Sequence, residues 1–278
     1  RTNRFKKIIL PILEEENVPP ELFYLAMIES GLNPNAYSYA HASGVWQFIS
    51  STGKMYGLDR SYHIDERLDF EKSTRAAATY LKDLYAEFDD WYLAFAAYNS
   101  GSGRVRKAIR RHGTRDYWKL YSLPKETRNY VPNIMAAIFI SKNPEKYGFT
   151  PNPLPDLEWT VKDLDKSVSV KQISECSNIS VKELRFYNPE LKHGIIPPLK
   201  EDEVYKFRLP TTASENFDSL FALIEITNDE IFNVKSHRVK YGENLSLIAK
   251  KYQVPMKDII SYNKISNLGF YHENLFFN

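Results

Sequence analysis

The sequence lacks the marks of several protein classes. It contains one cysteine, Cys176, so no internal disulfide can form, and the cysteine count allows both oxidising and reducing compartments. No apolar run approaches the roughly 20 residues of a membrane-spanning helix. Lysine and arginine total 37 against 35 aspartates and glutamates, a balance that argues against a protein built to bind nucleic acid by neutralising phosphates.

Sequence signals for metals and cofactors are also missing. The six histidines show no His-x-x-x-His spacing and the chain has no Cys-x-x-Cys pair, so we expect no metal site. The glycines at positions 101 and 103 lack the preceding strand and the third glycine of a nucleotide-binding loop. We therefore expect no cofactor.

Aromatic side chains, in contrast, are abundant. They make up 14% of the chain, and 19 residues are tyrosine, which offers a flat apolar face and a hydroxyl, the combination that binds sugar rings. Packed cores use tyrosine as well, so composition leaves carbohydrate binding and core packing both open. A chain of 278 residues with 43% hydrophobic composition is long enough for one large domain or two to three smaller ones.

The first half of the chain is predicted to be helical. From Leu22 onward, apolar residues repeat with the i, i+3, i+4, i+7 spacing of a helix face, in a segment that begins after Pro20 and ends near Gly31. Further helices are predicted at residues 77–88, 91–98, 105–109 and 127–140. The segment 143–156 then contains four prolines, which interrupt any helix and mark a linker.

The second half is predicted to be β-rich with short helices, and it matches itself weakly at a constant offset of 75 residues. Each copy is predicted as a helix, a turn, a second helix that ends in Tyr-Asn, and a strand, at residues 204–209 and 275–277. Five matches at one offset favour duplication of a small module. They pair Ile173 with Ile248, Val181 with Met256, Leu184 with Ile259, Tyr187 with Tyr262 and Asn188 with Asn263.

These patterns together predict an α+β multidomain fold. Its helical part is dominant in the first half, and its strands belong to the small modules. The predicted parts are a helical domain at residues 1–142, a Pro-rich linker at 143–160, a module at 161–212, a connector at 213–235 and a second module at 236–278.

Glu29 is the first candidate for chemistry. It lies on the apolar face of its predicted helix, directly after four apolar residues. A carboxyl there is partly desolvated, which disfavours its charged form and raises its pKa toward the range useful for donating a proton near neutrality. Taken alone, the same pattern fits a buried glutamate tied to a lysine or to backbone amides, and both interpretations stay open.

Four polar stretches follow in order along the helical half. They read Ser30-Gly31-Leu32-Asn33-Pro34, Ser43-Gly44-Val45-Trp46-Gln47-Phe48, Ala97-Tyr98-Asn99-Ser100-Gly101 and Glu126-Thr127-Arg128-Asn129-Tyr130-Val131. In this order they resemble the lytic transglycosylase domain of the goose-lysozyme-like superfamily, over about residues 1–150. The resemblance implies an all-α, lysozyme-like catalytic domain that cleaves the glycan strands of bacterial peptidoglycan.

The resemblance also implies a role for each matching residue. Glu29 is implied to be the catalytic acid and base, and the backbone around Gly44 to approach the sugar closely. The side chains implied to line the saccharide groove are Ser30, Gln47, Tyr98, Asn99 and Tyr130. Each has a structural alternative, since tyrosines at helix spacing are often core residues and an asparagine just before Gly101 fits a helix cap.

The sequence departs from the family pattern in two places: Val45-Trp46 stand where Leu-Met is usual, and Ser100 replaces a common Ala. Ordinary glycosidases place two carboxylates about 5 Å apart for retention or about 6.5–9.5 Å apart for inversion, and we identify no second acid in the four stretches. The resemblance implies that the N-acetyl group of N-acetylmuramic acid (MurNAc) assists instead, with a 1,6-anhydro product formed without water. A hydrolytic muramidase and a non-catalytic peptidoglycan-binding protein are the alternatives.

The last module carries a second resemblance. Its opening, from His237 to Tyr252, is similar to the first strand and helix of a LysM module, a βααβ unit that binds glycans containing N-acetylglucosamine (GlcNAc). The residues implied to bind glycan are Gly242, Glu243, Asn244 and Leu245. The copy at 161–212 lacks this opening and contains an insertion at residues 194–198, so glycan binding and a purely structural role are both open for it.

The implied substrate sets the remaining expectations. The partners are glycan strands of GlcNAc and MurNAc, with no nucleic acid, and we expect a monomer in the periplasm. Because the sequence begins with Arg1 rather than Met, we expect a leader or lipid anchor upstream, which attaches the protein to the outer membrane.

One charged feature stands outside this scheme. Five cations gather within eight residues and are either a solvated face or a surface that meets acidic stem peptides. They are Arg104, Arg106, Lys107, Arg110 and Arg111.

Overall fold

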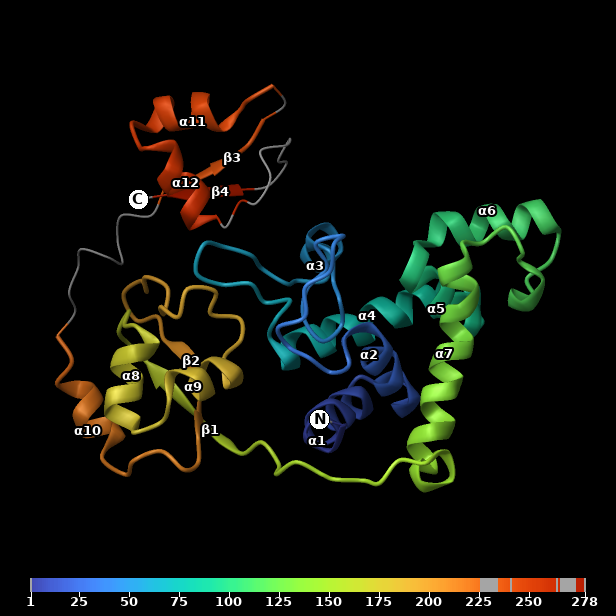
Figure 1. The fold of residues 1–278 in the computed structure, drawn as a ribbon, viewed down its shortest axis with the longest axis horizontal. Helices are drawn as coiled ribbons and strands as arrows, with labels where there is room; N and C mark the ends of the chain where they lie inside the picture. Colours follow the sequence, from blue (N-terminus) through green and yellow to red (C-terminus); the bar gives the residue numbers. More distant parts are fainter. Residues whose placement is uncertain (1, 226–234, 241, 264, 266–273, 278) are drawn as a thin grey trace. The chain divides into compact units, whose positions relative to one another are not determined.

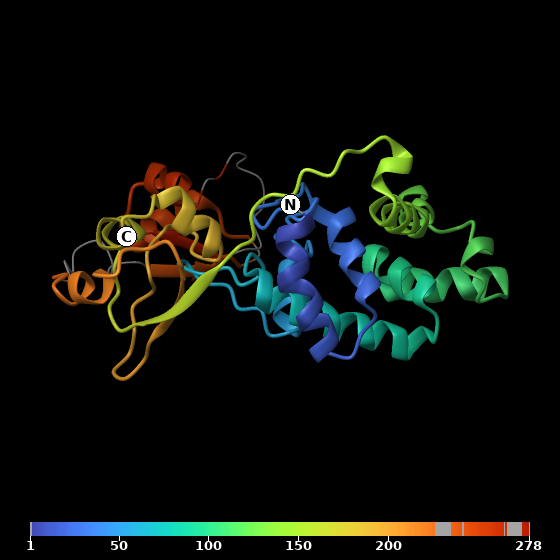
Figure 2. The same cartoon turned by 90° about the horizontal axis from the view of Figure 1, so that it is seen from below.

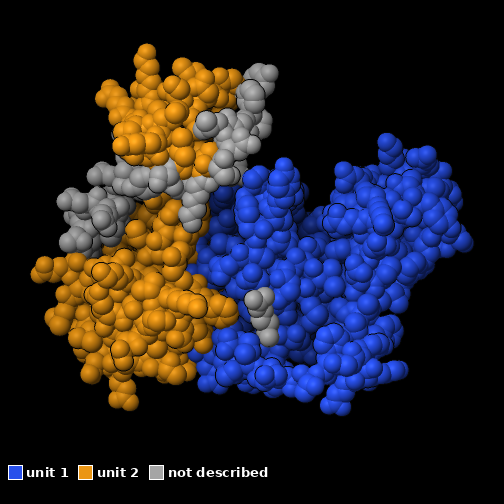
Figure 3. All heavy atoms as spheres, viewed as in Figure 1, with its two compact units in different colours: residues 1–60, 65–159, 188–190 blue, residues 61–64, 160–187, 191–278 orange. Residues whose placement is uncertain are grey.

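The protein divides into two compact units (Figure 3). Unit 1 comprises residues 1–60, 65–159 and 188–190, and unit 2 comprises residues 61–64, 160–187 and 191–278. The computed structural model describes residues 2–225, 235–240, 242–263, 265 and 274–277. Unit 1 is helical and unit 2 contains the strands, so the predicted α+β multidomain fold is confirmed.

Unit 1 is built from seven helices among its described residues (Figure 1). Every helix predicted from the sequence is present, most of them longer than the pattern indicated. Their bounds are α1 (Thr2–Glu15), α2 (Phe23–Ser30), α3 (Ser50–Met55), α4 (Phe70–Phe88), α5 (Trp91–Ser100), α6 (Ser102–His112) and α7 (Lys125–Lys142), with short 3₁₀ turns η1 (Pro20–Leu22), η2 (Tyr117–Lys119) and η3 (Pro144–Tyr147).

Local sequence signals set the ends of these helices. The Asp69 carboxylate accepts from the Glu71 and Lys72 amides at the start of α4, and the Asp90 carboxylate accepts from the Leu93 amide at the start of α5. Such side-chain caps satisfy amides that have no partner within the helix. At its other end, α2 stops at Gly31, whose left-handed φ of 59° favours glycine.

Packing in unit 1 brings distant segments of the chain together. Helix α4 packs against α1 and α5, and α7 packs against both α2 and α5 (Figure 1). The largest side chains between the helices, including Phe5, Leu25 and Phe70, are fully buried, and each contributes roughly 1.5–3 kcal/mol by leaving water. The ends of α2 and α5 therefore lie beside α7. This packing brings together three of the four polar stretches, residues 30–34, 97–101 and 126–131.

The segment predicted as a Pro-rich linker passes the N-terminal end of α1 (Figure 2), and all but its last residue belongs to unit 1. Arg4 donates to the Pro155 carbonyl at 2.6 Å, and Lys7 pairs with Asp156. The Trp159 ring meets Phe70 edge to face, with ring centroids 5.8 Å apart. The last residues of the linker are therefore held by contacts with the helical domain.

Unit 2 contains two modules of strand, helix, helix and strand. In the first, β1 (Trp159–Leu164) pairs with β2 (Tyr205–Pro210) around α8 (Val170–Ser177) and α9 (Val181–Tyr187). In the second, β3 (Lys235–Arg238) pairs antiparallel with β4 (Asn274–Phe277), with Lys235 opposite Phe277, around α11 (Leu245–Tyr252) and α12 (Met256–Tyr262). The helix bounds of the two modules differ by 75 residues at every end, so the predicted repeat is confirmed.

The cores of the modules explain the residues that repeat. Ile173 and Leu184 are fully buried in the first module, and their counterparts Ile248 and Ile259 are buried in the second. The first core also contains Phe217 and Phe221 from α10 (Phe217–Ala222). It therefore continues past residue 212, where the sequence predicts its end. Residues 226–234 of the predicted connector lie outside the described residues, and so does Tyr241 of the LysM opening.

Candidate active site

Glu29 stands on the last turn of α2. The residues before it, Phe23 to Ala26, are buried and fix the helix in the core, and Gly31 ends the helix two residues later. Glu29 itself is half-buried. The side chain is thus held by a rigid helix, and the residue keeps partial exposure.

Two neighbours and burial together set the acidity of Glu29. Burial is the largest influence and raises its pKa, the hydrogen bond from the Tyr130 hydroxyl to Oε1 lowers it, and the charge of Glu126 raises it. The balance places the pKa of Glu29 at about 7, against an ordinary value of 4.5. The raised pKa expected from the sequence is confirmed, and such a group is suited to donate and then accept a proton near neutral pH.

The two tyrosines of the motifs lie in the same buried surroundings. Burial and the nearby Glu29 charge raise the pKa of Tyr98 and of Tyr130 well above the ordinary value. Both phenols therefore stay protonated and act as hydrogen-bond donors. Tyr130 donates to Glu29, whereas Tyr98 donates to the Trp46 carbonyl at 2.7 Å.

Residues 43–48, which we call the Gly44 loop, are held by side chains of the other motifs. Ser30 donates to the Val45 carbonyl at 2.8 Å, and Tyr98 holds the next carbonyl. Gln47, in a left-handed conformation with φ of 50°, donates its side-chain amide to the carbonyls of Gly44 at 2.8 Å and Ala36 at 3.3 Å. Three residues that the resemblance assigns to the groove thus shape a loop backbone, and their contact with sugar stays a prediction.

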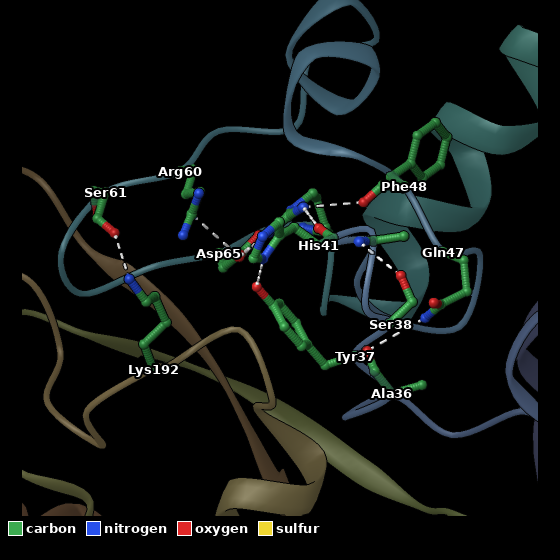
Figure 4. Close-up of polar contacts among 12 residues, drawn as sticks. Ala36, Tyr37, Ser38, His41, Gln47, Phe48, Arg60, Ser61, Asp65 and Lys192 are labelled. Carbon is green, nitrogen blue, oxygen red and sulfur yellow. Dashed lines mark hydrogen bonds and ion pairs between the residues drawn. The ribbon is translucent and has the colours of Figure 1, made fainter. Parts of the chain in front are cut away.

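A buried ion pair completes the support of this loop (Figure 4). Arg67 is 2% exposed and donates to the carbonyl of His41 at 2.9 Å, just before the Gly44 loop, and to that of Phe48 at 3.0 Å, the last residue of the loop. Figure 4 labels His41, Phe48 and Asp65 among these residues. The remaining nitrogens of Arg67 contact the Asp65 carboxylate at 2.9 Å and 2.7 Å, which holds the pKa of Asp65 below its ordinary value. No spacing in the sequence singles out either residue, and sequence reasoning missed both.

Comparison with known families decides the nature of this unit. The family described as Transglycosylase SLT domain matches residues 8–121, which contain Glu29, the Gly44 loop and Tyr98. The chain carries a transglycosylase SLT domain. Residues 160–226 match the LysM-like domain of lytic transglycosylase MltD, and residues 237–268 match the LysM domain. The resemblances drawn from the motifs are confirmed.

Individual relatives agree with these domain matches. Membrane-bound lytic murein transglycosylase D of Escherichia coli K12 is 34% identical over 269 residues, covering 91% of this chain and 58% of the relative. The chain thus spans a little over half the length of that relative. Soluble lytic murein transglycosylase of the same organism is 32% identical over 120 residues, covering 40% of this chain and 19% of the relative. A solved structure, the 70 kDa soluble lytic transglycosylase of E. coli, aligns at 29% identity with a TM-score of 0.40 over 46% of this chain and 23% of that one.

The start of α7 brings a second acid close to the SLT site. Glu126 is exposed, accepts a hydrogen bond from the Asn99 side-chain amide at 3.4 Å, and lies close enough to Glu29 to raise its pKa. The Thr127 hydroxyl donates to the other end of Asn99 at 2.8 Å. The sequence prediction that the motifs hold no second acid is therefore wrong. The residue stood in the fourth stretch, but only the fold shows that α7 carries it toward α2.

The LysM residues implied to bind glycan are engaged within their own module. Glu243 accepts from the Lys240 amide at 2.7 Å and is bonded to the His237 ring at 2.8 Å, and Asn244 caps α11 by accepting from the Leu247 amide at 2.9 Å. Leu245 is buried in the core, and Gly242 turns the chain with φ of 87°. These residues build the loop at the head of α11, and glycan contact stays a prediction.

Over the described ranges, no group of histidine, cysteine, aspartate and glutamate side chains is arranged to hold a metal ion. None of the described helices is long and apolar enough to cross a bilayer.

Proposed function

We propose that this protein is a peptidoglycan lytic transglycosylase, which cleaves the MurNAc-β-1,4-GlcNAc bond and leaves a 1,6-anhydroMurNAc end. The observation that carries the proposal is Glu29, a half-buried carboxyl with a pKa of about 7, contacted by the Tyr130 hydroxyl. The SLT domain and the lytic murein transglycosylases among the relatives support the same substrate.

The reaction needs one proton donor that becomes a proton acceptor. Protonated Glu29 gives its proton to the glycosidic oxygen as the bond from that oxygen to C1 of MurNAc breaks. The N-acetyl oxygen of the same sugar stabilises the cationic C1. Ionised Glu29 then takes the proton of the C6 hydroxyl, whose oxygen bonds to C1 and closes the anhydro ring. Glu29 ends protonated as it began, and no water is consumed.

The surrounding residues serve orientation, from which an intramolecular attack gains most. Tyr130 fixes one oxygen of Glu29, and the Gly44 loop presents its backbone beside α2. We propose that Gln47, Asn99 and the backbone at Gly44 contact the saccharide as the strand lies in the site, with Ser30 and Tyr98 holding the loop that receives it.

The LysM modules give the proposed enzyme a second binding site for peptidoglycan strands. A module that binds GlcNAc-containing strands raises the local concentration of substrate at the SLT domain without adding catalytic groups. We place the protein in the periplasm as a monomer, attached to the outer membrane by a lipid anchor, because its proposed substrate lies there.

Hydrolytic muramidase activity is the second candidate, and Glu126 favours it. A carboxylate near Glu29 offers a base that activates water, as in inverting glycosidases. Mass spectrometry of peptidoglycan digests separates the two functions. The proposed reaction gives MurNAc ends one water molecule lighter than reducing ends, whereas digests that contain only reducing ends establish the muramidase.

Tyr130→Phe is expected to shift the pH dependence of cleavage. The hydrogen bond from Tyr130 lowers the pKa of Glu29, so its loss raises that pKa above about 7. Cleavage requires protonated Glu29 and falls as pH rises through its pKa; the alkaline limb of kcat/KM therefore moves to higher pH, while the maximal rate decreases. Tyr56→Phe is the control: it removes a hydroxyl that donates to Asp83, and it leaves the pH dependence of cleavage unchanged. If the alkaline limb of kcat/KM stays in place in Tyr130→Phe, it is not set by a Glu29 that Tyr130 contacts.

Removal of residues 227–278 is expected to weaken binding to insoluble sacculi. The deletion removes the module that matches the LysM domain and leaves the core of the first module intact. Losing one of two linked binding sites lowers the bound fraction by about tenfold or more, and cleavage of short soluble strands stays at the rate of the full chain. Pelleting with sacculi measures the first effect, and equal pelleting of both proteins contradicts the tethering role.

A further inference from the structure

Helix α6 carries a net positive charge, whereas the rest of the chain carries no net positive charge. The whole chain carries a net charge of only +2, whereas α6 contains no acidic residue and five cations, all of them exposed. Its packing is supplied by Val105 and Ala108, its two buried residues. The charges are therefore not required to fold the helix onto its neighbours.

The first turn of α6 lies next to the residues of the site on α5. The chain passes from α5, whose last turn carries Tyr98 and Asn99, through Gly101 directly into α6, and the two helices pack together. Arg104 on the first turn of α6 reaches back to donate to the Ser100 carbonyl at 3.4 Å. The cationic helix thus begins three residues after Asn99.

The five cations differ in their partners and in the face of the helix that they occupy. Arg106 forms an ion pair with Glu87 at 2.7 Å. Arg104, Lys107 and Arg111, at i, i+3 and i+7, share one face of the helix, and no ion pair joins any of them to an acid in the described part of the chain. We call these three residues the α6 stripe.

Helix energetics alone do not account for the stripe. Cations in the last turn, such as Arg111, are stabilised by the helix dipole, but Arg104 lies in the first turn, where a cation is unfavourable. Like charges three and four residues apart also repel each other along a helix. A face kept cationic against both effects is expected to meet an anion.

We propose that the α6 stripe binds the carboxylates of the stem peptides on the strand being cleaved. This inference rests on the proposed function. The β-1,4 linked sugars are uncharged where a peptide is attached, so the free carboxylates of the peptides are the anions closest to the scissile bond. Each peptide is attached to the strand through the lactyl group of MurNAc, the sugar that Glu29 acts on. The cationic face of the helix that follows Asn99 is placed to receive it.

The test compares two soluble substrates of the same length, peptide-bearing strands and strands whose peptide carboxylates have been converted to methyl amides. The variant Lys107→Gln/Arg111→Gln removes two charges from the stripe. The control Arg75→Gln/Arg106→Gln removes two exposed charges from the same unit that are already paired, with Glu15 and Glu87. The KM is measured for each protein on each substrate at low and at high ionic strength.

We expect the stripe variant to raise KM on peptide-bearing strands by about three- to tenfold at low ionic strength, as two exposed ion pairs allow, with a smaller effect at high ionic strength. On amidated strands its KM equals that of the natural sequence, and the control changes neither value. An equal rise on both substrates, or no rise on either, overturns the proposal. Absence of anhydro products from the unaltered protein on both substrates instead refutes the proposed function.

Discussion

Glu29→Gln is expected to lower the rate of glycan cleavage by about three orders of magnitude, within the range that general acid and base catalysis supplies. Glutamine keeps the shape of the side chain and its contact with Tyr130, but it has no proton to give to the glycosidic oxygen. The measurement is the release of soluble fragments from sacculi, with binding to sacculi as the control for correct folding. Cleavage by the variant at the natural rate refutes the role of Glu29, and absence of cleavage by the unaltered protein establishes the non-catalytic alternative.

The same substitution is expected to stabilise the fold at and above neutral pH. The pKa of Glu29 is about 7 in the folded protein against an ordinary value of 4.5, so the folded state holds its proton more tightly than the unfolded chain. The stability contributed by that proton is therefore lost as pH rises from about 4.5 to about 7. Glu29→Gln removes this loss, a gain of about 2–3 kcal/mol above pH 7. Thermal unfolding checks it: the variant melts higher than the natural sequence at pH 8 and at the same temperature at pH 4.

Gly44→Ala is expected to disrupt the conformation of the Gly44 loop, with large effects on stability and on cleavage. A methyl group on Gly44 lies 1.9 Å from the Arg67 carbonyl oxygen, and its φ of +81° is itself unfavourable for alanine. Either the loop or the Arg67 backbone must move, which breaks hydrogen bonds on both sides. We expect a loss of about 2–4 kcal/mol in the free energy of unfolding and a strong decrease in cleavage.

Gly57→Ala is the matched control for this effect. Gly57 has a similar φ of +78°, but no heavy atom lies within 4 Å of an added methyl group. It therefore bears only the conformational cost of about 1–2 kcal/mol and keeps full cleavage. Denaturant unfolding of both variants measures the difference, and equal destabilisation contradicts the close approach of Gly44 to Arg67.

The sequence predicted the elements whose signals are local. The apolar spacing before Glu29 indicated both its helix and its raised pKa, because burial on a helix face follows from periodicity. The offset of 75 residues indicated two modules, since each must fill the same small core. Residues 213–225 were predicted as a connector because α10 is too short to show a pattern, and only the packed core reveals Phe217.

The supports of the site could not be predicted in this way. Arg67 reaches carbonyls at residues 41 and 48, and no sequence pattern tells a buried arginine from an exposed one. Ser30 and Tyr98 were assigned to the groove through family resemblance, yet their hydroxyls hold the Gly44 loop. Glu126 influences Glu29 only because α7 folds back onto α2. Each of these facts depends on tertiary packing between distant segments.

Cleavage in water labelled with heavy oxygen tests whether the C6 hydroxyl or water attacks C1. If Glu29 acts as the sole acid and base and the C6 hydroxyl attacks C1, the released MurNAc ends contain no label and are one water molecule lighter than reducing ends. Hydrolysis with Glu126 as the base instead places one labelled oxygen on C1 of every new end. Unlabelled anhydro ends are the result that this account predicts, and labelled reducing ends contradict it.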